Sequence, residues 1–244
     1  MKICIDAGHC KLTPGKRAFD GSFFEYEFNL DVANRIKHHL ARHGVDSYVQ
    51  YIENSNPKTE LNARISAVNK DKPNLVVSIH ANAYGTDWNQ ANGWEIFCST
   101  PGNASAKGTV LAKAIQQNSK SLGLKDRGIK DAHGVAGIVV STTPPAVLIE
   151  HGFYTNQEEL DKLKSDSFRE LCAVCDSKGI LKYLGIAWKE GKNMSEQKKQ
   201  HWAEKHLESL VQKGIINSPE VHKDKLDEPL TRAQVFALID RVTE

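Results

Sequence analysis

Three short apolar runs in this chain each end on a side chain that can bind a metal or move a proton. Residues 2–6 lead through Ala7 and Gly8 to His9, residues 75–79 lead to His80, and residues 146–149 lead to Glu150. Strands that are apolar on both faces belong to buried, mostly parallel sheets, which bind ligands at the carboxyl ends of their strands. We therefore expect two imidazoles and a carboxylate to meet at one edge of one sheet.

Two histidines and one acidic residue, with a fourth position left for water, make a common catalytic zinc site. The acidic ligand must come from the region after the first strand, where Glu25 and Glu27 compete. If a helix starts near there, Glu25 and Asn29 share the helix face toward the sheet edge, whereas Glu27 points away. We predict one zinc ion on His9, Glu25 and His80.

Glu150 is not needed as a ligand and is the candidate catalytic residue. Its carboxylate would take a proton from the zinc-bound water, whose pKa the metal lowers toward 7, and would return a proton to the leaving amine. The alternative is that Glu150 pairs with another group, because burying an unpaired carboxylate costs free energy.

The elements that position these residues alternate between strand and helix patterns over residues 1–187. This alternation predicts an α/β fold with a mostly parallel sheet flanked by helices. Helices are expected from about Phe28 to Gly44, from Asn56 to Pro73, over 105–122 and over about 156–185. Strands are expected at 2–6, 45–51, 75–80, 93–98, near 138–141 and at 146–150.

Residues 1–185 resemble the zinc-dependent N-acetylmuramoyl-L-alanine amidases of the type 3 family. The motifs that carry the resemblance occur in the family's order: Ile5 to His9, Glu25 with Asn29 and Leu30, Leu61 to Arg64 with Asn69, Ser78 to Ala83, Gly93 to Glu95, Lys125 to Lys130, Pro145 to Glu150, Gly152 with Phe153, and Thr155 with Asn156. Two positions depart from the family: Cys10 stands where glycine is usual, and His151 where an apolar residue is usual.

The resemblance implies cleavage of the amide between the lactyl group of N-acetylmuramic acid and the first alanine of the peptidoglycan stem. It implies zinc on His9, Glu25 and His80, with Glu150 as the catalytic carboxylate. Asn82, in the motif around His80, is a candidate substrate contact. A zinc peptidase acting within the stem peptide and a catalytically silent wall-binding protein are the alternatives.

After a polar linker at 188–194, residues 195–244 predict a small all-α helix-loop-helix module. They resemble one copy of the S-layer homology repeat, which usually occurs in threes, and Gln234 stands where glutamate is usual. Arg232 follows a helix cap and is the candidate contact for an anionic cell-wall polymer. Met194 suggests a second translation start, whose 194–244 fragment would associate with the full-length chain. An incidental linker methionine is the alternative.

Composition restricts the partners. A net charge of +2, with no block of like charges, argues against nucleic acid. No apolar stretch is long enough to span a membrane, and the N-terminus lacks a signal-peptide pattern. Together with the resemblance, this suggests a phage lysin that is made in the host cytoplasm and acts on the wall after release. A host autolysin would need export.

Overall fold

The computed structural model describes residues 1–54, 56–103, 105–190 and 209–213. Contacts divide the chain into two units, 1–188 and 189–244. Of the predicted helical module, only residues 209–213 are described. Arg232 and Met194 lie outside the described residues, so the predictions that involve them stay open. Among the described residues, no helix has the length and apolar character to cross a membrane.

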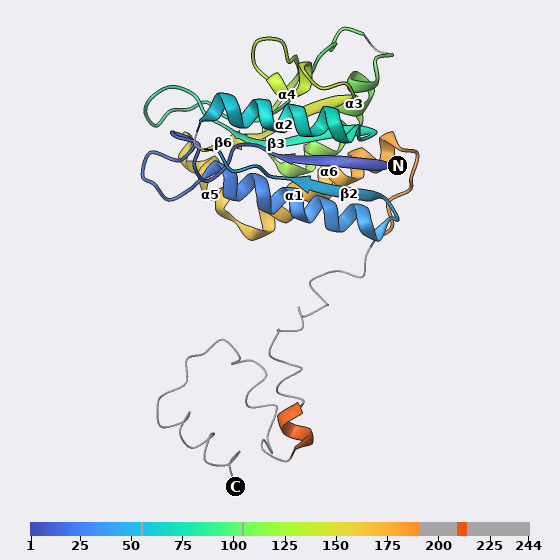
Figure 1. Ribbon diagram of the computed structural model, residues 1–244. Helices are drawn as coiled ribbons and strands as arrows, with labels where there is room; N and C mark the ends of the chain where they lie inside the picture. The colour runs from blue at the N-terminus through green and yellow to red at the C-terminus, as the bar shows by residue number, and fades with distance from the viewer. Residues whose placement is uncertain (55, 104, 191–208, 214–244) are drawn as a thin grey trace. The chain divides into compact units, whose positions relative to one another are not determined.

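The first unit is built on one sheet with helices on both faces, as the sequence predicts (Figure 1). The strands are β1 (Lys2–Ala7), β2 (Asp46–Gln50), β3 (Leu75–Asn82), β4 (Trp94–Cys98), β5 (Asp126–Asp131) and β6 (Ala146–Phe153). Their order across the sheet is β2-β1-β3-β6-β4-β5. Every neighbouring pair is parallel except β4 with β6, so the carboxyl ends of β1, β3 and β6 lie at the same edge.

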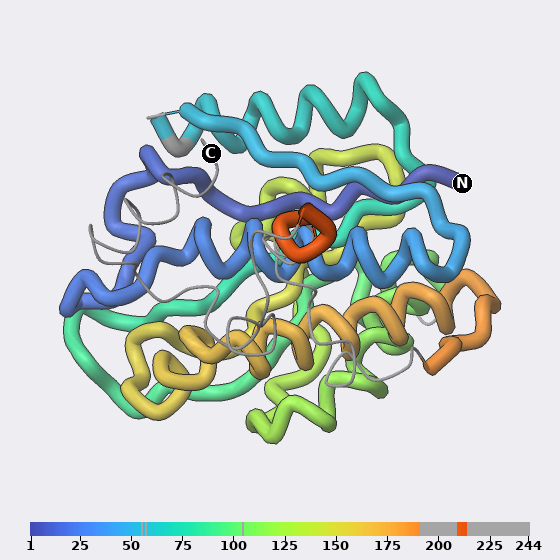
Figure 2. Tube along the Cα trace, turned by 90° about the horizontal axis from the view of Figure 1, so that it is seen from below, coloured from blue at the N-terminus to red at the C-terminus, as the bar shows by residue number. Residues whose placement is uncertain are grey.

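Apolar residues on the two faces of the sheet form two cores. One core joins the sheet to α1 (Glu25–Arg42), α3 (Lys107–Ser119), α5 (Gln157–Lys164) and α6 (Asp166–Tyr183). The other joins the opposite face to α2 (Pro57–Asp71) and α4 (Gly137–Val140). The view from below shows α1 and α6 running side by side (Figure 2).

Local sequence explains where the main helices form. In α1, Phe28, Val32, Ile36 and Leu40 recur every fourth residue and are all buried, and the helix ends just before Gly44, which has a φ of 72°. The side chain of Asn56 caps α2 by accepting hydrogen bonds from the backbone of Lys58 and Thr59.

Two elements differ from the prediction. The strand expected near 138–141 is wrong, because Gly137–Val140 forms the short helix α4, whose Ile138 and Val139 pack into the core. A short apolar run has no period that separates strand from helix. The sequence also missed β5, in which four of six residues are charged, as is common at the edge of a sheet. Lys120–Leu122 continues α3 as a 3-10 turn.

Candidate metal centre

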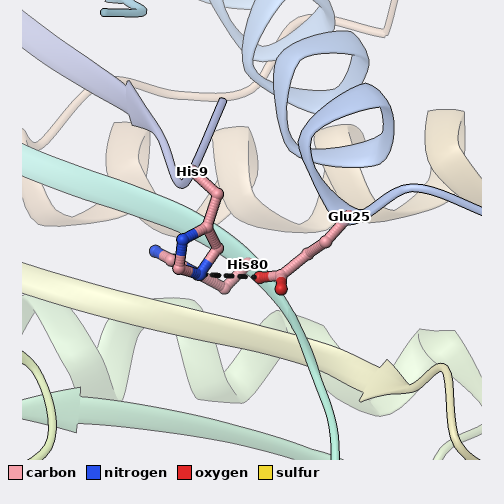
Figure 3. Close-up of side chains that lie close together, drawn as sticks. All are labelled: His9, Glu25 and His80. Carbon is pink, nitrogen blue, oxygen red and sulfur yellow. Dashed lines mark hydrogen bonds and ion pairs between the residues drawn. The ribbon is translucent and has the colours of Figure 1, made fainter. Parts of the chain in front are cut away.

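The two predicted histidine ligands meet at the carboxyl edge of neighbouring parallel strands. β1 pairs with β3 so that Ala7 lies beside Ile79, which brings His9, just beyond β1, next to His80. Their rings are perpendicular, with centroids 4.9 Å apart. Glu25 is the first residue of α1 and points into the same space (Figure 3).

Donor atoms of His9, Glu25 and His80 all lie within 4.8 Å of one another. Glu25 Oε1 is 2.9 Å from His80 Nδ1 and 3.5 Å from His9 Nε2. Glu25 and His80 are buried, whereas Glu27 is exposed and accepts a hydrogen bond from Tyr26. The structure therefore brings Glu25, and not Glu27, to the two imidazoles.

The turn before His9 keeps these side chains close together. Gly8 donates from its backbone N–H to the carbonyl of Ile79, and its own carbonyl accepts from Asn29 Nδ2 at 2.8 Å. A Cβ at Gly8 would lie 2.1 Å from His80 Cε1 and Nε2. Only glycine therefore lets the backbone of β1 pass so near the His80 ring. His9 itself has a φ of 58°, a left-handed conformation that turns the chain at this point.

Burial sets the protonation of the two rings. It lowers the pKa of both His9 and His80 to about 3, because a charged imidazolium loses its hydration there. The nearby Glu25 carboxylate opposes this shift at His9, but burial outweighs it. Both rings are therefore neutral near pH 7, which is the form that binds a metal.

The three residues fit a zinc ion. His9 Nδ1 and His80 Nε2 are buried and have no hydrogen-bond partner among the described residues. Glu25 Oε2 is also buried, and it lies 3.8 Å from Lys16 Nζ. Unpartnered buried polar atoms cost free energy, which a metal ligand bond would recover. Two neutral imidazoles and a carboxylate are donors that zinc accepts in four-coordinate sites with an open position.

Glu150 lies beside this centre on the next strand of the sheet. β6 pairs with β3 so that Glu150 is the direct neighbour of His80. Its Oε2 is buried without a hydrogen-bond partner among the described residues. Burial, and then the negative charge of Glu25, raise the pKa of Glu150 well above its ordinary value. A carboxyl group whose pKa is raised in this way is suited to take up and release a proton during a reaction.

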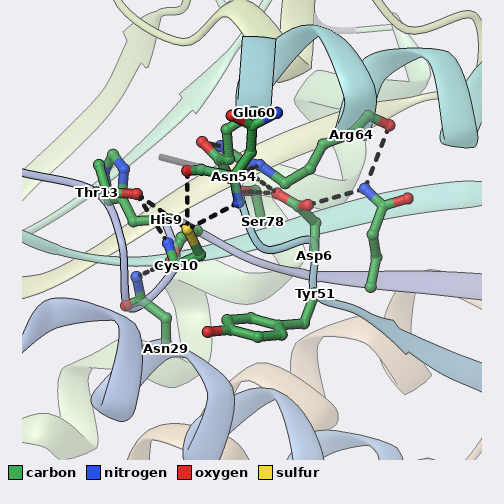
Figure 4. Close-up of polar contacts among 12 residues, drawn as sticks. Asp6, His9, Cys10, Thr13, Asn29, Tyr51, Asn54, Glu60, Arg64 and Ser78 are labelled. Carbon is green, nitrogen blue, oxygen red and sulfur yellow. Dashed lines mark hydrogen bonds and ion pairs between the residues drawn. The ribbon is translucent and has the colours of Figure 1, made fainter. Parts of the chain in front are cut away.

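A buried ion network, for which the sequence gives no local signal, surrounds Asp6 near the end of β1 (Figure 4). Arg64 Nη1 donates to Asp6 Oδ2 at 2.6 Å, and Arg64 Nε lies 2.6 Å from Glu60 Oε1. Ser78 and Gln50 also donate to the Asp6 carboxylate. All three charged groups are buried, so the network ties the end of β1 to α2 and β3.

The two departures from the family lie on either side of the centre. Cys10 Sγ is 3.5 Å from Thr13 Oγ1 and 3.3 Å from the carbonyl of Asn54, and it is not among the clustered donor atoms (Figure 4). His151 is buried on the opposite face of the sheet from Glu150. Its Nε2 is 2.8 Å from Asp176 Oδ2, and its Nδ1 is 3.2 Å from the carbonyl of His80.

Asn82, the predicted substrate contact, is engaged within the protein. Its Nδ2 donates to Glu95 Oε1 at 2.8 Å, and its Oδ1 accepts from the backbone of Ala83. Glu95 was a motif residue to which the sequence assigned no role. It is the β4 neighbour of Glu150 and is buried.

Comparisons with known proteins identify the family of this chain. The chain is 32% identical over 183 residues to the N-acetylmuramoyl-L-alanine amidase LytC of Bacillus subtilis, covering 74% of this chain and 35% of LytC. It is 31% identical over 193 residues to the endolysin of Bacillus phage SPP1, covering 78% of this chain and 68% of that protein. The chain thus spans about a third of LytC and two thirds of the endolysin.

Solved structures of the same kind superpose on the first unit. The catalytic domain of CwlV, an N-acetylmuramoyl-L-alanine amidase from Bacillus (Paenibacillus) polymyxa, aligns with a TM-score of 0.65 at 27% identity, covering 76% of this chain and 99% of that one. The catalytic domain of CD27L, an endolysin targeting Clostridia difficile, aligns with a TM-score of 0.61 at 27% identity, covering 75% of this chain and 97% of that one. Residues 3–182 match the family described as N-acetylmuramoyl-L-alanine amidase. The chain therefore belongs to this amidase family.

Proposed function

We propose that this chain is a zinc-dependent peptidoglycan hydrolase. It cleaves the amide between N-acetylmuramic acid and the L-alanine of the stem peptide, with zinc on His9, Glu25 and His80. The observation that carries the proposal is the gathering of these three donors within 4.8 Å, with Glu150 as the strand neighbour of His80. The choice of the cleaved bond rests on membership of the amidase family.

The residues have separate tasks. Zinc, when bound, supplies a Lewis acid that polarises the scissile carbonyl and acidifies a water molecule. Glu150 accepts the proton of the attacking water and later donates a proton to the leaving amine of alanine. Its buried Oε2 and raised pKa suit both steps, because the carboxyl group must be able to carry the proton between them. Lys16, whose Nζ is 3.8 Å from Glu25 Oε2, adds positive charge at this side of the centre.

Digestion of purified cell walls tests the proposal. The wild-type chain with zinc should release stem peptides that begin with a free L-alanine amino group, and a chelator should stop the release. Glu150→Gln should lower turnover by about 10²-fold or more, since general acid–base catalysis contributes this much. Glu158→Gln is the matched control, because Glu158 is exposed on α5. Full activity of Glu150→Gln would refute its assignment.

The same digestion separates the alternatives. A zinc peptidase acting within the stem would release shortened peptides and leave L-alanine attached to muramic acid. A catalytically silent wall-binding protein would sediment with walls and release nothing. The clustered donors together with Glu150 favour the enzyme, because a receptor has no use for a carboxyl group placed beside a metal centre.

We further propose that the chain acts as a phage lysin on the host wall, and the likeness to a phage endolysin supports this role. Residues 195–244 would then form an S-layer-homology-like module that binds an anionic wall polymer through Arg232. Wall sedimentation of the full chain and of Arg232→Gln tests this binding, and unchanged sedimentation would count against it.

Self-association through residues 194–244 is a separate part of the proposal. Expression from a gene with an intact Met194 codon should yield a small second product that co-purifies with the full chain. Mass spectrometry detects the fragment, and Met194→Leu should remove it. If the intact gene yields no such fragment, the hypothesis is wrong.

A further inference from the structure

Beyond the metal centre, a row of polar residues crosses the sheet. His80 pairs with Glu150, and Glu150 pairs with Glu95, so three neighbouring strands each contribute one residue. These residues share the face of Val76, Leu148 and Phe97, which is the face that carries α2 and α4. Strands lie about 4.8 Å apart, which places Glu95 about 10 Å from His80 along the row.

Glu95 ends this row and holds two cations in place. Its Oε2 accepts from Arg127 Nε at 2.6 Å and also from Lys130 Nζ, both of which come from β5. Its Oε1 accepts from Asn82. Burial would raise the pKa of Glu95, but the hydrogen bonds from Lys130 and Arg127 outweigh it and hold this pKa below the usual value. Glu95 is therefore a charged carboxylate, and its hydrogen bonds hold Asn82, Arg127 and Lys130 in place.

The two cations carry more charge than Glu95 can neutralise. Within the described residues, the ion pairs of Arg127 and Lys130 are both made with Glu95. Glu159, which accepts from the backbone of Gly93 and Phe153, adds negative charge near Arg127 but makes no ion pair with it among these residues. The side chains of Arg127 and Lys130 remain 30% and 37% exposed, compared with 5% for Glu95. A structural ion pair needs one cation, so the second is available for an external anion.

Arg127 is also fixed in orientation. Its Nη1 donates to the carbonyl of Asn92 at 3.3 Å, and its guanidinium lies 4.9 Å from the centre of the Phe153 ring. Nearby acidic groups are directed elsewhere: Asp126 accepts from Gly128 and Gln116, and Asp131 from His133. A cation that is held in place before binding loses little entropy on pairing with a carboxylate.

We propose that Arg127 and Lys130 form a subsite for a carboxylate of the stem peptide. The carboxylate is the α-carboxylate of the second residue beyond the scissile amide. This inference rests on the proposed function. An extended peptide advances about 3.5 Å per residue. In this arrangement the scissile amide lies at the metal centre, and the stem peptide runs along the row toward β4. The second residue of the stem then reaches the two cations. A free α-carboxylate there pairs with both, whereas an α-amide does not.

Two synthetic substrates test the subsite in the full, zinc-loaded chain. They are N-acetylmuramoyl-L-alanyl-D-isoglutamate and its isoglutamine counterpart, each with the γ-carboxyl group capped as a methylamide, so that the two differ only in an α-carboxylate or an α-amide. Wild type should favour the carboxylate by about tenfold or more in kcat/KM, mainly through KM, as expected for a hydrogen bond to a charged group. Lys130→Met and Arg127→Gln should each reduce this preference by lowering kcat/KM on the carboxylate substrate more than on the amide substrate. Lys125→Met is the matched control, because Lys125 is exposed two residues before Arg127.

The outcomes are distinct. Equal cleavage of both substrates by wild type, or equal effects of Lys125→Met and Lys130→Met, overturns the subsite but leaves the amidase intact. Inhibition by a glycerol phosphate polymer, with no preference between the two substrates, also overturns it and assigns the cations to a wall phosphate. Cleavage of neither substrate overturns the proposed function and the subsite together.

Discussion

Neutral imidazoles distinguish this metal centre from a pair of surface histidines. A histidine in an unfolded chain has a pKa near 6.5, whereas burial lowers the pKa of both His9 and His80 to about 3. The folded chain therefore keeps both rings neutral over the pH range between these pKa values, in which the histidines of an unfolded chain gain a proton. A metal that binds these rings would not have to displace protons from them at mildly acidic pH.

Lowering the pH from 7.5 to 5.5 is therefore expected to weaken zinc binding by less than about tenfold. Metal affinity falls only as the pH drops below the pKa of the ligand, because the protonated ring cannot bind. Two histidines with a pKa near 6.5 would lose about a hundredfold over this range, and a pKa near 3 moves that loss to more acidic pH. Competition with a chromogenic chelator at pH 5.5, 6.5 and 7.5 measures Kd. A hundredfold loss would contradict the prediction.

Gly8→Ala is expected to weaken zinc binding by about ten- to a hundredfold, as changes that misorient a ligand do. The added Cβ would lie 2.1 Å from His80 ring atoms, so either the ring or the backbone must move. Gly102→Ala is the control, because a Cβ at Gly102 meets nothing within 4 Å. The same competition assay measures both variants. Equal zinc affinity in the two would show that the contact at Gly8 is unimportant.

At the scale of elements, the ends of β1, β3 and β6 were predictable because each apolar run stops at a polar residue. Glu25 was predictable from its helical spacing to Asn29. The position of the proposed subsite residues Arg127 and Lys130 was not predictable, because β5 lacks an apolar run and its sequence is typical of a turn. The short helix α4 was misread for the converse reason: its residues are apolar, and a single turn has no recognisable period.

The link between β1 and α2 depends on the buried guanidinium of Arg64. Arg64→Met should lower the free energy of unfolding by about 3–5 kcal/mol, because it leaves the Asp6 and Glu60 carboxylates buried without their cation. Lys2→Met is the control, since its pair with Asp71 is 44% and 41% exposed and an ion pair that is open to solvent contributes little to stability. Denaturant unfolding measures both. A loss below about 1 kcal/mol for Arg64→Met would show that the network contributes little.

At the scale of the whole molecule, the sequence predicted the architecture of residues 1–187 and which strand ends converge. It could not predict which interactions surround the metal centre. The Asp6, Glu60 and Arg64 network and the Glu95 row each join residues from separate elements, and their pairing depends on strand order. The antiparallel placement of β4 beside β6, which makes Glu95 the neighbour of Glu150, follows from tertiary packing and has no local signal.

The candidate metal centre joins segments that are distant in sequence, because His9 follows β1, Glu25 begins α1 and His80 lies near the end of β3. Only the folded chain presents all three donors, so zinc should stabilise the folded state. With free zinc at 1,000 times Kd, the gain is about 4 kcal/mol, which should raise the Tm of the first unit by about 8–16 °C over that in chelator. Differential scanning calorimetry measures the rise. Glu150→Gln should show the same rise because Glu150 is not a ligand, and magnesium should produce none. If the rise disappears in Glu150→Gln, the proposed ligand set is wrong.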